Sequence, residues 1–143
     1  MSEFRIDRAL EVAAAAALGS DFVNKIATEG NPFTPPTAGV WAQLTNLRAA
    51  ADVASLGRGG MDDHTGVLQI DITVPAKSAN PRAVLLGHAD RVRAYFVAGR
   101  PFTFQGQTVR VRNASVSSMR LVDTDQRVSV SVSYTALTFR PEI

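Results

Sequence analysis

The spacing of apolar residues along the chain predicts two amphipathic helices. From about Glu3 to Leu18, apolar residues recur every three or four positions, as on one side of an α-helix: Ile6, Leu10, Ala13 and Ala17. Gly19 is a natural stop for this helix. A second helix is expected between Asn80, with Pro81 in its first turn, and Gly99. Its apolar stripe consists of Leu85, Ala89, Val92 and Phe96.

Alternation of apolar and polar residues predicts strands elsewhere. The stretch "VLQIDITVP" (67–75) places four apolar side chains on one face: Leu68, Ile70, Ile72 and Val74. The stretch "RVSVSVSY" (127–134) does the same with Val128, Val130, Val132 and Tyr134, and its serines point outward. After Ala136 the apolar residues are Leu137 and Phe139, so the inward parity changes, which predicts a β-bulge near Ala136.

These elements indicate a single α+β domain over residues 1–143. We expect a mainly antiparallel β-sheet of about four to five strands, with two α-helices packed on one face. Further strands are expected over 40–47 and 108–121. Residues 48–57 either continue the strand before them or form a short helix. The glycine-rich stretch "LGRGGMDDHTG" predicts a loop whose residues 57–66 are mobile until a partner orders them.

The stretch "GNPFTPPTAGVWAQL" (30–44) predicts a stiff, extended arm. Pro35 and Pro36 lead directly into a strand that carries the only tryptophan, Trp41. Proline has no amide hydrogen for a sheet ladder, so the chain cannot be paired centrally until it has passed Pro36. Phe33 and Trp41 either anchor this arm on another subunit or fill the core of the domain itself. The residues alone leave both alternatives open.

Composition narrows the class of protein. An apolar fraction of 45% and a charged fraction of 20% are typical of a soluble globular protein. The net charge is only +2, but 13 of the 15 basic residues are arginine. Arginine forms bidentate and stacked contacts at interfaces, although a GC-rich genome explains its excess equally well. The alanine-rich run in the first helix is too short to span a bilayer, so no membrane partner is expected.

The chain carries no pattern typical of catalysis. It has no cysteine, which excludes disulfides and thiolate metal sites. The "GRGG" at 57–60 lacks the Lys-Ser/Thr of a phosphate-binding loop. Neighbouring donors in "MDDH" at 61–64 cannot all converge on one zinc ion. The "DTDQR" at 123–127 lacks the glycine and glutamate of a calcium loop, and the charges of "HADR" at 88–91 point to different helix faces. We expect no enzyme activity, cofactor or metal.

Four segments, taken in order, carry a resemblance to a known family. They are "NPFTPPTAGVWAQL", "GVLQIDITVP", "HADRVRAYFVAGRPF" and "RVSVSVSYTAL". The residues that match are Phe33, Pro35, Pro36, Trp41, Gly66, Leu68, Gln69, Ile70, Ile72, Asp90, Phe96 and Gly99. This order resembles the bacteriophage tail terminator family, the tail-completion proteins of long-tailed phages, over nearly the whole chain.

The resemblance implies a structural virion protein that is assembled in the host cytoplasm. A homo-hexameric ring would sit on the head-proximal end of the finished tail tube. It would stop polymerisation of the tail tube protein and present a surface for the head-tail connector protein. Genomic DNA would pass through the lumen without specific binding. Two alternatives remain: a head-tail connector or neck protein of the same virion, and a basic α+β domain that binds a ligand or nucleic acid. Tight, steeply salt-dependent binding to duplex DNA would favour the last.

The resemblance and the arm together select two sets of candidate residues. The candidates for the subunit interface are Phe33, Pro35, Pro36 and Trp41. The candidates for contact with the tube or the connector lie in the glycine-rich loop: Arg58, Gly59, Gly60, Met61, Asp62, Asp63 and His64.

Overall fold

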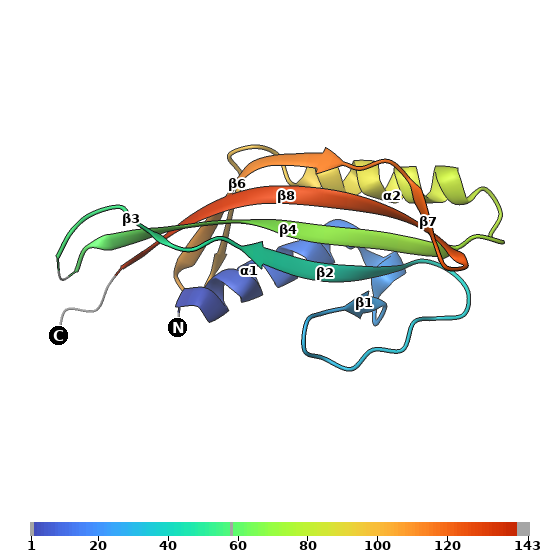
Figure 1. Ribbon diagram of the computed structural model, residues 1–143, viewed down its shortest axis with the longest axis horizontal. Helices are drawn as coiled ribbons and strands as arrows, with labels where there is room; N and C mark the ends of the chain where they lie inside the picture. Colours follow the sequence, from blue (N-terminus) through green and yellow to red (C-terminus); the bar gives the residue numbers. More distant parts are fainter. Residues whose placement is uncertain (1, 58, 140–143) are drawn as a thin grey trace.

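The computed structural model describes residues 2–57 and 59–139. The elements follow one another as α1 (Ser2–Leu18), a 3-10 turn η1 (Ser20–Phe22), β1 (Ile26–Ala27), β2 (Trp41–Arg48), β3 (Asp52–Val53), β4 (Met61–Pro75), α2 (Pro81–Tyr95), β5 (Pro101–Phe104), β6 (Gln107–Val116), β7 (Arg120–Val122) and β8 (Asp125–Phe139). Figure 1 shows β4 and β8 running side by side along the length of the molecule.

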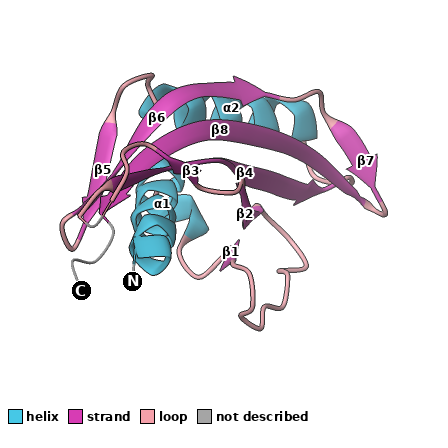
Figure 2. Ribbon diagram, turned by 60° about the vertical axis from the view of Figure 1, so that its left-hand side comes forward, coloured by secondary structure: helices cyan, strands magenta, loops and turns pink. Residues whose placement is uncertain are grey.

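The eight strands form one mixed sheet. Its main path is β1-β2-β4-β8-β6-β5, while β3 pairs with β4 and β7 pairs with β8 beside this path. The β1–β2 pair is parallel, and the other pairs are antiparallel. Figure 2 shows the sheet curling into a half-barrel.

The predicted fold, with four to five strands and two helices packed on one face, is therefore wrong. The described chain is mostly β, with eight strands and two α-helices. The physical reason lies in β4 and β8, which are 15 residues long each. Strands twist with a fixed hand, so long paired strands coil instead of forming a flat layer. α1 packs against β5, β6 and α2, whereas α2 packs against β4, β6 and β8.

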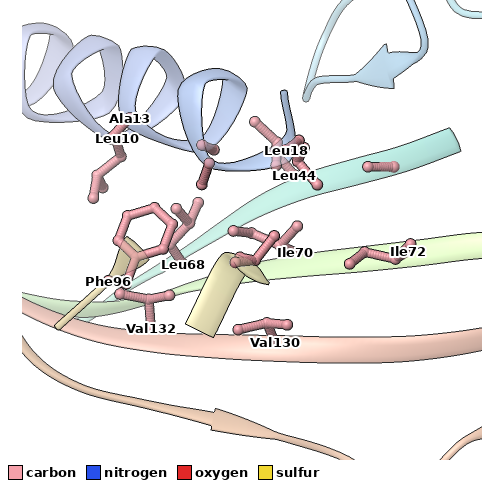
Figure 3. Packing of buried hydrophobic residues seen from close by; sticks show 14 of the residues in the cluster. Leu10, Ala13, Leu18, Leu44, Leu68, Ile70, Ile72, Phe96, Val130 and Val132 are labelled. Atoms are coloured by element: carbon pink, nitrogen blue, oxygen red, sulfur yellow. The ribbon is translucent and has the colours of Figure 1, made fainter. Parts of the chain in front are cut away.

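The two helical stripes are confirmed, and both belong to one core. All four stripe residues of α1 are buried, as are Leu85, Ala89, Val92 and Phe96. Figure 3 shows Leu10 and Ala13 of α1 in the same cluster as Phe96 and the inward residues of β4 and β8. α1 ends at Leu18, and Gly19 adopts φ 82° while its amide donates to the carbonyl of Ala15. This is a conformation that favours glycine.

The predicted bulge near Ala136 is wrong. Alternation in β8 continues past this residue, so Ala136 and Thr138 are buried and the larger Leu137 and Phe139 are exposed. The bulge lies instead in β6, at residues 111–113. Two apolar side chains that the sequence assigned to the core therefore stand on the surface.

The glycine-rich loop is shorter than predicted. Residues 61–66 are the first part of β4, and β8 pairs with them along their whole length. Residues 62 and 63 also pair with β3 on their other side. The main-chain hydrogen bonds of residues 61–66 are thus made with neighbouring strands, although the glycine content had indicated a loop. Within residues 48–57 there is neither a helix nor a long strand, but the two-residue β3.

Candidate assembly surfaces

β2 places Trp41 on the face of the sheet that points away from the core. Ala42 belongs to the core cluster, and Trp41, its neighbour on the opposite face, does not. Trp41 is nevertheless only 8% exposed, because other parts of its own chain cover it. The Phe33 ring lies 5.5 Å from the Trp41 ring, and the Arg127 guanidinium lies 5.9 Å from the ring centroid. Arg127 is oriented by its Nε, which donates to Thr73 Oγ1 at 3.1 Å.

Residues 28–40, which we call the arm, begin at the edge of β2, where Glu29 Oε1 accepts a hydrogen bond from the Asn46 amide at 2.7 Å. Further along the arm, Phe33 reaches Trp41 on the outer face. Phe33 and Pro36 are half-buried, while Pro35 is exposed. Gly30 and Gly39 have φ of 78° and 84°, so each end of the arm bends at a position suited to glycine. The structure thus brings Phe33 and Trp41 together within one subunit, outside the core, and presents the prolines beside them.

A second feature of the outer face is a buried carboxylate, which the sequence analysis missed. Asp71 in β4 is 4% exposed. The Ser129 hydroxyl of β8 donates to Asp71, and Gln69 Nε2 donates to it at 3.0 Å. Arg120 of β7 lies 3.6 Å from Asp71 Oδ1 and donates to Ser129 Oγ at 2.9 Å. These partners compensate the buried charge and fasten β7 to the sheet. The site depends on the pairing of β7 with β8, which brings Arg120 to Asp71, so no local pattern signals it.

A third polar group lies on the inner face, beneath α1. The Tyr134 hydroxyl donates to Asn46 Oδ1 at 2.7 Å, and Asn46 Nδ2 donates to Asp7 at 3.2 Å. Arg48 pairs with the same carboxylate at 3.0 Å. Burial raises the pKa of Tyr134, while the hydrogen bond to Asn46 acts in the opposite direction. The network ties α1 to β2 and β8. It passes beside Gly66, whose missing Cβ leaves room for the tyrosine.

The candidate loop residues do not gather at one place. Arg58 lies outside the described residues. Gly59 and Gly60 belong to the loop, but Met61 to His64 stand on β4. Asp63 accepts a hydrogen bond from Thr135 Oγ1 at 2.8 Å. His64 faces the other way, with Nδ1 2.9 Å from Glu3 and Nε2 2.8 Å from Thr138 Oγ1. Alternation along a strand therefore sends neighbouring candidates to opposite faces.

The ribbon formed by residues 52–53, 61–64 and 136–139 projects beyond the body of the molecule, and we call it the tip ribbon. In Figure 1 it extends at the end that carries β3. Large apolar side chains on the ribbon and the adjoining loop are strongly exposed: Val53 62%, Leu56 89%, Leu137 48% and Phe139 74%. Between the end of β8 and the β5–β6 hairpin lies a groove of about 520 Å³. The sequence missed this surface because the predicted bulge turned the last two residues inward.

Exposed arginines lie along β6 and near the end of α2, and one of them, Arg110, lines this groove. Arg100 lies over the Tyr95 ring at 4.1 Å, and Arg110 NH1 donates to the carbonyl of Gly99 at 3.2 Å. Arg93 Nε donates to the carbonyl of Ala114 at 3.3 Å. Among the described residues, none of these arginines forms an ion pair. The guanidinium groups are thus held in place by neutral partners and keep their charge available.

The histidine on α2 contacts Arg91 and Phe22. His88 Nδ1 lies 3.1 Å from Arg91 NH2, and its ring meets Phe22 edge to face at 5.0 Å. Burial, and after it the positive charge of Arg91, lowers the pKa of His88, while Asp21 acts in the opposite direction. Asp90 is exposed on another side of the helix, as predicted. The ring contact of His88 with Phe22 connects α2 to η1.

Metal binding and membrane insertion can be addressed from the described side chains and helices. In residues 2–57 and 59–139, no group of histidine and carboxylate side chains is arranged to hold a metal ion. In the same ranges, no helix has the length and apolar character needed to cross a membrane.

Known proteins were compared with the chain at two levels. A family model described as "Phage tail terminator protein" matches residues 5–134. No curated protein matches the sequence. One solved structure is 28% identical in sequence and superposes with a TM-score of 0.75, covering 99% of each chain. The name of that protein states no function. The family match includes the arm, both helices and most of the sheet.

Proposed function

The chain belongs to the phage tail terminator family, and we propose on that basis that it caps the phage tail tube. Its role is structural, in assembly of the virion tail. In the proposed role a homo-hexameric ring, assembled in the host cytoplasm, sits on the head-proximal end of the tube. The ring stops polymerisation of the tail tube protein and offers a surface to the head-tail connector protein. Genomic DNA passes through the lumen without specific binding.

The observation that carries this proposal is the extent of the family match. It spans residues 5–134 of a 143-residue chain and so covers most of the architecture instead of one motif. The exposed apolar side chains of the tip ribbon add support. Large exposed apolar patches on a small protein mark sites where other proteins bind.

For the ring we propose the arm as one subunit contact, through Phe33, Pro35, Pro36 and Trp41. The arm lies outside the core, and Pro35 is exposed on it. A proline-stiffened segment that is already held in place loses little conformational freedom when a neighbour docks on it. In this arrangement the Trp41 ring packs between the sheet and Phe33, and Phe33 in turn positions the prolines.

For the tube or the connector we propose the other candidate set, Arg58 to His64. This segment includes the end of the glycine-rich loop and the start of β4. Asp63 lies in the groove beside the tip ribbon, where a partner has access to it. His64 contributes indirectly, because its contact with Glu3 joins the ribbon to α1.

Negative-stain microscopy of the purified protein mixed with tail tubes tests the proposed function. Rings at one end of each tube are expected, and tubes assembled in the presence of the protein should have uniform length. Tubes that keep growing with bare ends at saturating protein would overturn the proposal. Tight binding to duplex DNA with a steep salt dependence would point instead to a nucleic-acid-binding protein.

The arm is tested with Phe33→Ala, with Val97→Ala as a control that shortens an exposed apolar side chain elsewhere. The Phe33 variant should remain folded in a thermal melt but assemble poorly into rings, because losing one aromatic anchor typically weakens an interface by about 2 kcal/mol or more. The closed ring repeats this loss at every contact. A lower melting temperature of the subunit together with normal tail length would show that the arm only stabilises its own subunit and is not a subunit contact.

A further inference from the structure

One edge of β8 is open at the tip ribbon. β4 pairs with β8 all the way to Phe139, whereas pairing with β6 on the other side ends at Thr135. Within residues 2–57 and 59–139, no strand pairs with this second side of residues 136–139. The carbonyl of Leu137 points to that side, since it accepts a hydrogen bond from Gln107 Nε2 at 2.9 Å. The main chain of β8 therefore presents a short, unpaired sheet edge.

The β5–β6 hairpin is what keeps this edge open. Its turn has φ of 48° at Gln105 and 83° at Gly106. In the described part of the chain, residues 107–109 of β6 pair with β5 and not with β8. The hairpin diverges from β8 and leaves the groove of about 520 Å³ between them. An open edge with an apolar border is a template for another extended chain, because main-chain donors and acceptors recognise a strand.

The same ribbon carries a second open edge, on β3. Among the described residues, 52 and 53 pair with β4 and with no other strand, so their other side faces away from the sheet. β4 separates the two open edges, and each copy of the chain therefore has one of each kind. A ring needs two different, complementary patches on every subunit. The edges of β3 and β8 meet this requirement.

Charge selects β3 as the strand that enters the groove. Asp52 lies directly opposite Asp63 in the register, and like charges in that position are unfavourable. Arg110 lines the groove, is exposed, and forms no ion pair within the described chain. When β3 of a second copy lies along β8, the Asp52 carboxylate of that copy lies next to the Arg110 guanidinium and can form an ion pair with it. The proline arm is a poorer occupant, because its prolines lack the amide hydrogens that a strand needs.

We propose that β8 residues 136–139 accept residues 49–54 of a second copy of this chain as an added strand, with Asp52 of that copy paired to Arg110. The proposal rests on the ring of the proposed function and names two surfaces that join its subunits. Gln107 covers the Leu137 carbonyl in the separate subunit. The incoming main chain replaces this side-chain amide and extends the sheet from one subunit into the next.

A cross-linking experiment tests the contact, and the absence of native cysteine makes it specific. The variant Asp52→Cys/Leu137→Cys carries one thiol on each open edge. Within one copy these positions are two strands apart, roughly 9–10 Å, which is too far for a disulfide. Oxidation should therefore give a ladder of linked subunits up to the closed ring. Each single-cysteine variant is the control and should give no ladder, because a lone thiol has no second thiol opposite it across the proposed contact. A double variant that forms rings but no ladder would overturn the proposal.

Charge reversal provides a second test, read by mass photometry of ring formation. Arg110→Glu and Asp52→Arg should each reduce assembly at least tenfold, and the combined variant should restore it. Arg82→Glu, an exposed reversal at the start of α2, should assemble normally. Arg110→Gln, which removes the charge but keeps a polar side chain, serves if Arg110→Glu melts early. Single variants that assemble like the wild type overturn only the β3–β8 contact. A wild-type protein that forms no ring with or without tubes overturns the proposed function as well.

Discussion

Gly66→Ala is predicted to destabilise the subunit strongly, although it adds only one methyl group. Gly66 lies on β4 between the main chain of β2 and the Tyr134 ring. A Cβ at this position would stand 2.6 Å from the Tyr134 hydroxyl oxygen, 2.8 Å from its Cζ and 2.9 Å from the carbonyl oxygen of Leu47. The carbonyl belongs to a paired strand, and the hydroxyl is held by its bond to Asn46. Neither group can move away from an added Cβ without weakening its own hydrogen bonds.

The magnitude follows from these contacts. Overpacking by one carbon typically costs about 1–3 kcal/mol in the free energy of unfolding. If the tyrosine moves instead, the buried Asn46 oxygen loses its donor, which costs about 1–3 kcal/mol by itself. We expect a total loss of about 3 kcal/mol, or roughly 10 °C in the melting temperature of a chain of this size.

Urea and thermal unfolding of the purified subunit, followed by circular dichroism, measure this loss. Gly87→Ala is the matched control, because Gly87 is exposed on α2 and a Cβ there meets nothing within 4 Å. The same substitution should raise stability at that site by about 0.5–1 kcal/mol, since alanine is the better helix former. The same Gly→Ala change is thus expected to lower the free energy of unfolding at position 66 and to raise it at position 87.

A double-mutant cycle tests the cause. Tyr134→Phe removes the atom nearest to the added Cβ, so Gly66→Ala should be milder in that background, by about 1 kcal/mol. Strictly additive losses would show that the tyrosine hydroxyl is not the obstacle. If Gly66→Ala were as harmless as Gly87→Ala, the close packing of β4 under Tyr134 would be refuted.

Two further predictions concern the sheet face and pH. Val130→Asp should unfold the domain, because Val130 is fully buried and an unpaired carboxylate there costs several kcal/mol, about 3 or more; Ser131→Asp should be tolerated, and equal losses in a thermal melt would contradict the assigned facing. The pKa of His88 is lowered by burial and by Arg91, so its contribution to stability is complete above the unfolded value of about 6.5 and is lost as pH falls through the lower folded value. Urea midpoints between about pH 7 and 5 should therefore fall less in His88→Gln than in the wild type, and parallel curves would show that His88 does not contribute.

Much of the candidate site depended on contacts that no sequence pattern announces. The stiffness of the arm follows from its prolines, but its position over Trp41 depends on where β2 meets β4 in the sheet. Asp71 looked like an outward polar residue in an alternating strand. It is buried because β7, only three residues long, folds back beside it. Short strands carry too few residues for a periodic signal, although they decide which side chains are covered.

The sequence by itself determined the period and facing of the long helices and strands. Helical stripes such as Leu85 to Phe96 and the alternation of Val128, Val130 and Val132 were confirmed, because burial of apolar side chains imposes the period of each element. The family was also recognisable from the order of its segments. Tertiary structure alone decided the number of strands, the curl of the sheet and the exposure of Leu137 and Phe139. These features depend on how strands pair and twist over long separations, and a strand's own residues specify which side chains share a face but not which neighbour covers it.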